Sequence, residues 1–142
     1  EHAVDQGDVR QIGISNCYDL ELLRRLYQSA RIKPSVVQNR LYSQTNYDFE
    51  LRAFCRSNNV LYQSFWTLTA NPHVLESSVM RDISAAINKT PEQVFFRFLT
   101  QHSVIPLTGT TSLVHMKEDL AIFDFELTDV ECRQINALGP FV

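Results

Sequence analysis

A cysteine between a short strand and a helix is the first residue that could do chemistry. Cys17 follows a β-branched run that ends at Ser15 and precedes a helix that begins near Asp19. Backbone amides at a helix start can stabilise a thiolate, which makes a nucleophile conceivable. No histidine is identifiable as its base, and a half-buried structural cysteine is commoner than a reactive one. We therefore keep nucleophilic catalysis only as a minor alternative.

Metal, disulfide and phosphate-loop chemistry find no support in the residue spacing. Three histidines share no metal-ligand spacing, so we expect no metal site: His73, His102 and His115. The three cysteines are far apart and form no C-x-x-C pair, which fits a reducing compartment: Cys17, Cys55 and Cys132. The four glycines form neither a G-x-G-x-x-G turn nor a P-loop: Gly7, Gly13, Gly109 and Gly139.

The composition is that of one compact domain, which we expect to span residues 1–142. The chain is 44% hydrophobic and 20% charged, with a net charge of -3 and a pI near 5.8. Its cations are scattered, so we expect no nucleic acid partner. No stretch approaches the roughly 20 apolar residues of a membrane helix, and the first residues do not form a signal peptide. We therefore expect a cytoplasmic protein that does not bind a membrane.

The start of the chain resembles the last turn of a helix. Glu1 to Val4 precede Gly7 without an initiating Met or an N-cap. We expect a processed or truncated product of a longer polypeptide, or an unusual gene product.

Strands and helices alternate along the chain. Residues 9–15 predict a strand, followed by an amphipathic helix that Asp19 can cap. Residues 36–39 and 60–65 predict the next two strands, with a helix over 48–57 between them. A weak helix over about 75–87 follows the third strand.

The last third of the chain contains the clearest helix starts. Thr90 begins a T-x-x-Q capping box with Pro at the first helical position, and four apolar residues form the buried stripe: Val94, Phe95, Phe98 and Leu99. Residues 104–107 predict a fourth strand, and residues 114–122 a helix after a tight loop. A capping box at Thr128 opens a final helix that Gly139-Pro140 stops.

Alternating strands and helices imply a parallel sheet with right-handed crossovers. Two α/β architectures compete: a self-sufficient doubly wound domain, and half of a (β/α)8 TIM barrel with four parallel strand-helix units plus a C-terminal helix. A full barrel takes about 250 residues, so four units fit this length. The pattern alone leaves the two close to even.

Four segments together resemble the aldo-keto reductases, from the fifth strand of that family to just past its eighth helix. They are VRQIGISNCYDLELLRRL, KPSVVQNRLY, TPEQVFFRFLTQHSVIPLTGTT and HMKEDLAIFDFELT. The similarity covers nearly the whole chain, and the motifs occur in the family's order. The resemblance implies the C-terminal half of a TIM barrel, in a family that reduces aldehydes and ketones with NADPH, less often NADH.

The resemblance also implies a cofactor site at the carboxyl ends of the strands. Ser15, Asn16 and Gln38 match the residues that hold the nicotinamide carboxamide, for which amide side chains offer both donors and acceptors. Phe65, or less readily Trp66, takes the place of the ring that stacks on the nicotinamide. The remaining positions match those around the pyrophosphate and adenosine: Thr67, Leu68, Leu107, Thr108, Gly109, Thr110, Thr111, His115, Glu118 and Asp119.

The adenosine positions depart from the family pattern. Leu107 and His115 stand where many members have Lys and Arg, which bind the 2'-phosphate of NADP. Lys117 could partly compensate, and Asp119 stands where an Asn often meets the adenine. The resemblance implies NADP as cofactor, with NAD possible.

The family's catalytic Asp, Tyr, Lys and His all come from the first half of its barrel, and none of those positions lies in this sequence. We expect no catalytic residue here and no reductase turnover by this chain alone. A half barrel also exposes two strand edges and an inner face, so we expect a second copy, a complementary N-terminal half or another partner to cover them. The alternative to a reductase half is a non-catalytic oligomerising or partner-binding module.

Overall fold

The computed structural model, which describes residues 1–141, contains one sheet of four parallel strands in the order β1-β2-β3-β4. The strands are β1 (Gly13–Ser15), β2 (Val36–Arg40), β3 (Leu61–Phe65) and β4 (Val104–Pro106). Each strand pairs with its neighbour in sequence, as in consecutive units of a barrel, whereas a doubly wound sheet reverses its strand order. The predicted half of a (β/α)8 barrel is confirmed. Val142, the last residue of the predicted domain, lies outside the described residues.

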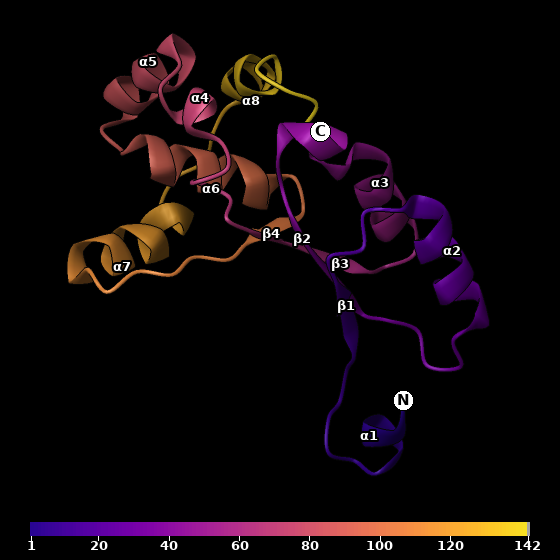
Figure 1. Cartoon of the computed structure of the whole chain (residues 1–142). Coiled ribbons are helices and arrows are strands. Elements are labelled where there is room, and N and C mark those ends of the chain that lie inside the picture. The colour runs from indigo at the N-terminus through magenta and orange to yellow at the C-terminus, as the bar shows by residue number, and fades with distance from the viewer. Residues whose placement is uncertain (142) are drawn as a thin grey trace.

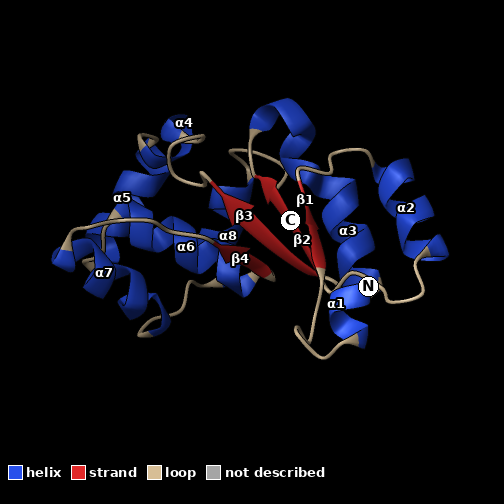
Figure 2. Cartoon of the chain, turned by 60° about the horizontal axis from the view of Figure 1, so that its bottom comes forward, coloured by secondary structure: helices blue, strands red, loops and turns tan. Residues whose placement is uncertain are grey.

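Helices flank the sheet and connect its strands (Figures 1 and 2). They are α1 (His2–Asp5), α2 (Leu20–Ser29), α3 (Phe49–Ser57), α4 (Pro72–Leu75), α5 (Ser78–Ile87), α6 (Pro91–Gln101), α7 (Leu113–Leu120) and α8 (Asp129–Asn136), with 3-10 turns η1 (Ser43–Asp48) and η2 (Ala121–Phe123). Within residues 1–141, no helix has the length and apolar character needed to cross a bilayer.

The predicted helix caps are confirmed. The Thr90 hydroxyl accepts a hydrogen bond from the Gln93 amide at 3.2 Å, and the Gln93 side chain accepts one from the Thr90 amide at 3.1 Å. Thr128 forms the same capping box at the start of α8. The Asp19 carboxylate accepts from the first amides of α2. Each cap satisfies amide groups that have no partner inside the helix, which fixes where the helix begins.

The boundaries of most elements shift from the prediction by a few residues, and two elements differ most. β1 contains only Gly13–Ser15, not the whole of residues 9–15. The segment just before Val36, which would have to pair with the residues before Gly13, contains Pro34, and proline cannot donate to a strand ladder. The weak helix predicted over 75–87 begins only at Ser78, as α5, because the Ser77 hydroxyl accepts from the Met80 amide and caps it there. Leu75 instead ends the separate short helix α4.

The two faces of the sheet differ in burial. Alternate residues of β2 and β3 are buried beneath the helices: Val37, Asn39, Tyr62 and Ser64. On the opposite face, Leu61 is 49% exposed and Ile105 is 38% exposed. Because side chains of a strand alternate between faces, the helices cover one face only, and the described residues leave the other uncovered.

An aromatic cluster completes the core near the end of the chain. The fully buried Phe141 ring lies 4.3 Å from the Tyr47 ring and 5.5 Å from the Phe95 ring, between centroids. The buried Arg52 guanidinium donates to the carbonyl oxygens of Tyr47, Pro140 and Phe141. The tail after α8 is therefore packed into the core and held by backbone hydrogen bonds.

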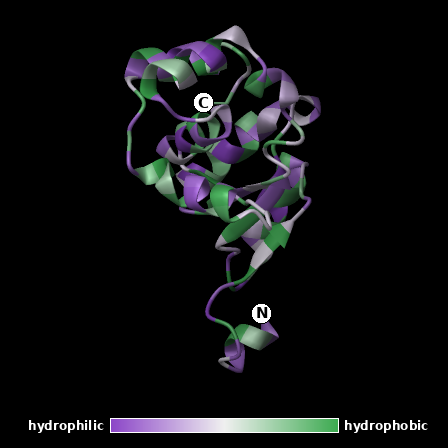
Figure 3. Cartoon of the chain, turned by 90° about the vertical axis from the view of Figure 1, so that its left-hand side faces the viewer, coloured by the Kyte–Doolittle hydropathy of each residue, from purple (hydrophilic) through white to green (hydrophobic). Residues whose placement is uncertain are grey.

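The first helix lies apart from this core. Figures 1 and 3 show α1 at the end of an extended segment, away from the sheet and the other helices. None of its residues is buried. Arg31, after α2, makes ion pairs with Asp5 at 2.6 Å and Glu1 at 3.6 Å, and these surface pairs are worth little to stability.

Replacing Phe141 with alanine tests the contribution of the tail. Removing a fully buried phenylalanine leaves a cavity, so we expect Phe141→Ala to lower the free energy of unfolding by about 3–5 kcal/mol in urea denaturation. Phe123 is 65% exposed and serves as a control. Phe123→Ala should change stability by less than about 1 kcal/mol. Equal losses in the two variants would contradict the placement of the tail in the core.

Candidate functional site

The carboxyl ends of β1 and β2 bring together Ser15, Asn16 and Gln38. The Ser15 hydroxyl and the Asn16 backbone amide each donate to the Gln38 carbonyl oxygen at 3.0 Å. The Asn16 side-chain amide donates to the Ser15 hydroxyl at 3.3 Å. Asn16 has a φ of 56°, a left-handed conformation that asparagine tolerates better than most residues. These three predicted site residues therefore share one location.

Gln63 extends this row across the uncovered face, although the sequence reasoning did not select it. Ser15 pairs with Gln38, and Gln38 pairs with Gln63, so their side chains share one face of the sheet. The Gln38 side-chain amide donates to the Gln63 side-chain oxygen at 3.0 Å. The signal in the sequence was the equal spacing, because each glutamine stands two residues before its strand ends.

A second group of aromatic side chains, separate from the one around Phe141, lies beside this row at the same end of the sheet. Trp66 is 62% exposed and has a φ of 55°. The Arg40 guanidinium carbon lies 4.4 Å from the Trp66 ring centroid and 5.2 Å from that of Tyr42. The Tyr18 hydroxyl accepts from the Arg40 backbone amide at 3.0 Å and donates to the Asn16 side chain at 3.3 Å. Arg40, Tyr18 and Tyr42 were not among the predicted residues.

Two adjoining cavities continue from the ends of β3 and β4. One, of about 640 Å³, is lined by residues that include Phe65, Trp66, Thr67, Leu68, Leu107, Thr108 and Gly109. The second, of about 440 Å³, shares Leu68, Thr108 and Gly109 with it and adds Thr110, His115, Glu118 and Asp119. The three shared residues join the two cavities into one groove. Of the predicted residues in this region, Thr111 alone lines neither cavity.

The second cavity is lined by carboxylates rather than by cations. Glu92, Glu118 and Asp119 lie in its wall, and no Lys or Arg of residues 1–141 is among its lining residues. The Thr108 hydroxyl donates to the Asp119 carboxylate at 2.8 Å, and the Thr110 hydroxyl lies 3.5 Å from the His115 ring. Carboxylates raise the electrostatic cost of placing a phosphate there.

A buried polar network beneath the sheet positions the segment after β1. The Asn39 side chain accepts from the Cys17 amide at 2.9 Å and donates to the Cys17 carbonyl and to the Asp48 carboxylate, both at 2.7 Å. The Tyr62 hydroxyl donates to the same Asp48 oxygen at 2.8 Å. Burial, with the Asp48 charge beside it, raises the pKa of Tyr62. This network fixes Asn16 next to Gln38.

The cysteine geometry does not favour a nucleophile at Cys17. All three cysteines are free, and the Cys17 thiol donates weakly to the Asp19 carbonyl oxygen at 3.9 Å. Burial raises the pKa of Cys17, and burial together with Asp48 raises the pKa of Cys55 to about 12. Both groups are therefore thiols at neutral pH. In residues 1–141, no three His, Cys, Asp or Glu side chains come close enough to hold a metal ion.

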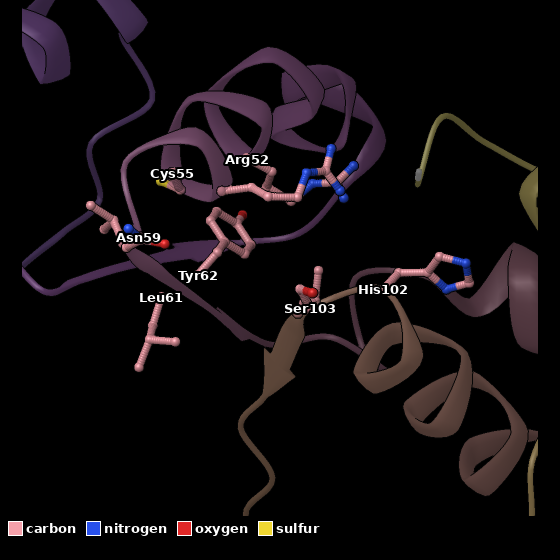
Figure 4. A pocket seen from close by; sticks show the side chains of 10 residues that line it. Arg52, Cys55, Asn59, Leu61, Tyr62, His102 and Ser103 are labelled. Atoms are coloured by element: carbon pink, nitrogen blue, oxygen red, sulfur yellow. The ribbon is translucent and has the colours of Figure 1, made fainter.

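The opposite end of the sheet has a smaller cavity, of about 290 Å³, lined by Arg52, Tyr62 and His102 among others. Figure 4 shows Tyr62 on the side of Arg52 and Leu61 directed away from it, which illustrates the alternation along β3. The Arg52 guanidinium is committed to three backbone carbonyls, and His102 lies 2.6 Å from the Phe98 carbonyl oxygen. Backbone carbonyls therefore already engage both side chains, and we assign no ligand to this cavity.

The chain is similar to known reductases over nearly its whole length. It is 31% identical to the 9,11-endoperoxide prostaglandin H2 reductase of Trypanosoma cruzi, covering 98% of this chain and 49% of that protein. It is 31% identical to the NADPH-dependent codeinone reductase 1-4 of Papaver somniferum, covering 93% and 42%. The crystal structure of an aldo-keto reductase from Brucella melitensis matches with a TM-score of 0.83 and 26% identity, covering 96% and 51%.

The similarity covers nearly all of this chain but only part of each relative. The chain spans about half the length of the curated relatives that it matches. No family model matches the sequence.

Thiol alkylation tests the burial of the cysteines. At pH 7 we expect Cys17 and Cys55 to react with iodoacetamide more slowly than a free thiol, because a raised pKa lowers the thiolate fraction. Cys55 should be the slowest, and all rates should increase as the pH rises. Mass spectrometry of each cysteine peptide measures the rates, and guanidinium-unfolded protein provides the control. A Cys17 that reacts faster when folded than when unfolded would restore the nucleophile hypothesis.

Proposed function

Because this chain is related in sequence and fold to the aldo-keto reductases and spans about half of each curated relative, we propose that it binds a nicotinamide dinucleotide and forms that part of a carbonyl reductase. In this proposal, residues 1–142 are one domain, the C-terminal half of the barrel. The observation that carries the proposal is the row of Ser15, Asn16, Gln38 and Gln63 beside a groove at the strand ends.

The proposed nicotinamide site uses the amides of this row. A carboxamide has both donors and an acceptor, and the Asn16 and Gln38 side chains can supply both to it. The Gln38–Gln63 hydrogen bond orients Gln38 before a ligand arrives. Phe65 or Trp66 then supplies a flat face for the nicotinamide ring. The dinucleotide, when bound, would supply the hydride for reduction of an aldehyde or ketone to an alcohol.

The rest of the cofactor would lie in the groove over β3 and β4. Thr67 and Leu68 would border the pyrophosphate, and the loop of residues 107–111 the adenosine. We propose NADP as the cofactor, with NAD as an alternative that the carboxylates of the second cavity favour. His115, Glu118 and Asp119 would lie near the adenine and its ribose.

The proposal assigns no catalytic residue to this chain. A carbonyl acquires negative charge as hydride is added, and a proton donor of suitable pKa must neutralise it. In the proposal, the Asp, Tyr, Lys and His of the family come from the other half of the barrel. This chain alone would bind cofactor without turnover.

The uncovered inner face favours a second role, as a module that binds a partner. Leu61 and Ile105 are exposed on this face, and β1 and β4 each pair with a single strand within residues 1–141. Unpaired strand edges readily accept further strands. A second copy or a complementary N-terminal half would cover both the edges and the face.

Cofactor titration tests the proposed site. We expect NADPH and NADH to change the emission of Trp66, the only tryptophan, with affinities within about tenfold of each other because the groove lacks a cationic phosphate site. Gln38→Leu should weaken the binding of both cofactors by roughly 1–3 kcal/mol, the cost of leaving polar groups unpaired. The exposed Gln28→Leu should bind as the parent does. Absence of binding at millimolar cofactor would contradict the proposal.

Sedimentation velocity tests the partner role. We expect the isolated chain to self-associate as its concentration rises, because burial of the exposed Leu61 and Ile105 side chains is favourable. A double substitution of Leu61 and Ile105 by Ser should shift the distribution toward monomer. The control is the same change at Leu113 and Leu120, which are exposed on α7. A stable monomer at all concentrations would argue against an oligomerising module.

A further inference from the structure

Arg40 is a cation without a polar partner for its side chain. No carboxylate lies within 4.0 Å of its guanidinium in residues 1–141, and only its backbone amide makes a hydrogen bond, to the Tyr18 hydroxyl. Its Nε atom is buried and has no hydrogen-bond partner. A guanidinium has five N–H donors, and leaving buried donors unpaired is unfavourable. Arg40 therefore has donors that no described residue satisfies.

The aromatic residues around Arg40 hold its guanidinium in place. Its carbon lies 4.4 Å from the Trp66 centroid and 5.2 Å from the Tyr42 centroid. Cation–π contacts favour the charge over a ring face but do not satisfy N–H groups. The terminal Nη donors, unlike the buried Nε, are not enclosed by the protein, and they stay available to an oxyanion, which a guanidinium can bind through two parallel hydrogen bonds.

The position of Arg40 on the sheet indicates where that oxyanion would come from. Arg40 follows Gln38 by two residues, so both side chains start from the same uncovered face, and Arg40 pairs with Phe65. Arg40 is therefore at the nicotinamide end of the proposed site. The loop of residues 107–111, proposed for the adenosine, follows β4 instead. A group next to the nicotinamide is closer to the reacting carbonyl than to the far half of the cofactor.

We propose that Arg40, held by Trp66 and Tyr42, forms a subsite for the carboxylate of the carbonyl substrate, so that the substrate class is oxo acids. This inference rests on the proposed dinucleotide function, which places the reacting carbon near Gln38. Arg40 acts as a specificity residue and takes no part in hydride or proton transfer.

Calorimetric titration of the full chain with malonate tests the subsite. The parent protein should bind malonate saturably, and Arg40→Met should weaken binding by about tenfold or more, because it removes the charge and keeps the apolar stem. Arg40→Lys should give an intermediate loss, since lysine lacks the paired donors. The control is Arg24→Met, because Arg24 also lies over an aromatic ring, that of Phe54, and pairs with Glu21.

The outcomes separate the subsite from the dinucleotide function. Malonate binding that depends on Arg40 and is unchanged by saturating NADH supports the proposal. Competition between malonate and NADH, together with Arg40-dependent binding of inorganic pyrophosphate, would assign Arg40 to the cofactor and overturn the carboxylate assignment. Equal malonate affinity in Arg40→Met and the parent, or no malonate binding, would also overturn it. Arg40-dependent malonate binding without any NADH or NADPH binding would support the anion subsite and count against the proposed function.

Discussion

The side-chain amide of Asn39 joins three parts of the structure that the chain alone would leave separate. Asn39 lies in β2. Its side chain forms hydrogen bonds with the backbone amide and carbonyl of Cys17, after β1, and donates to the carboxylate of Asp48, before α3. Because these groups are buried, each would be costly without its partner. The position of Asn16 beside Gln38, and with it the row of amides at the strand ends, depends on this arrangement.

Local signals in the sequence predicted the helices well, and long-range contacts limited the rest. The caps at Asp19, Thr90 and Thr128 were predictable because a cap joins residues only two or three apart. The length of β1 depends on Pro34 in the segment before β2, and the place of Gln63 beside Gln38 depends on strand register. A single sequence does not state which residues of different strands are paired.

The sequence predicted only part of the site, because the rest depends on contacts between residues far apart in the chain. Resemblance to a family indicated Ser15, Asn16 and Gln38, and the structure places them together. Arg40 has no signal of its own in the sequence, since an arginine at a strand end is usually solvated. Its unpaired donors become evident only when Trp66 and Tyr42 are seen beside it. The uncovered inner face likewise follows from helices that lie on one side of the sheet.

Nitrogen–proton NMR spectra of the side-chain amides during titration with NADH would detect the proposed carboxamide site residue by residue. We predict that the amide signals of Asn16, Gln38 and Gln63 shift together and saturate, since these groups surround the proposed carboxamide site. Signals of Gln28 and Gln101, on helices away from the strand ends, should stay in place. Shifts confined to residues near His102, at the opposite end of the sheet, would contradict it.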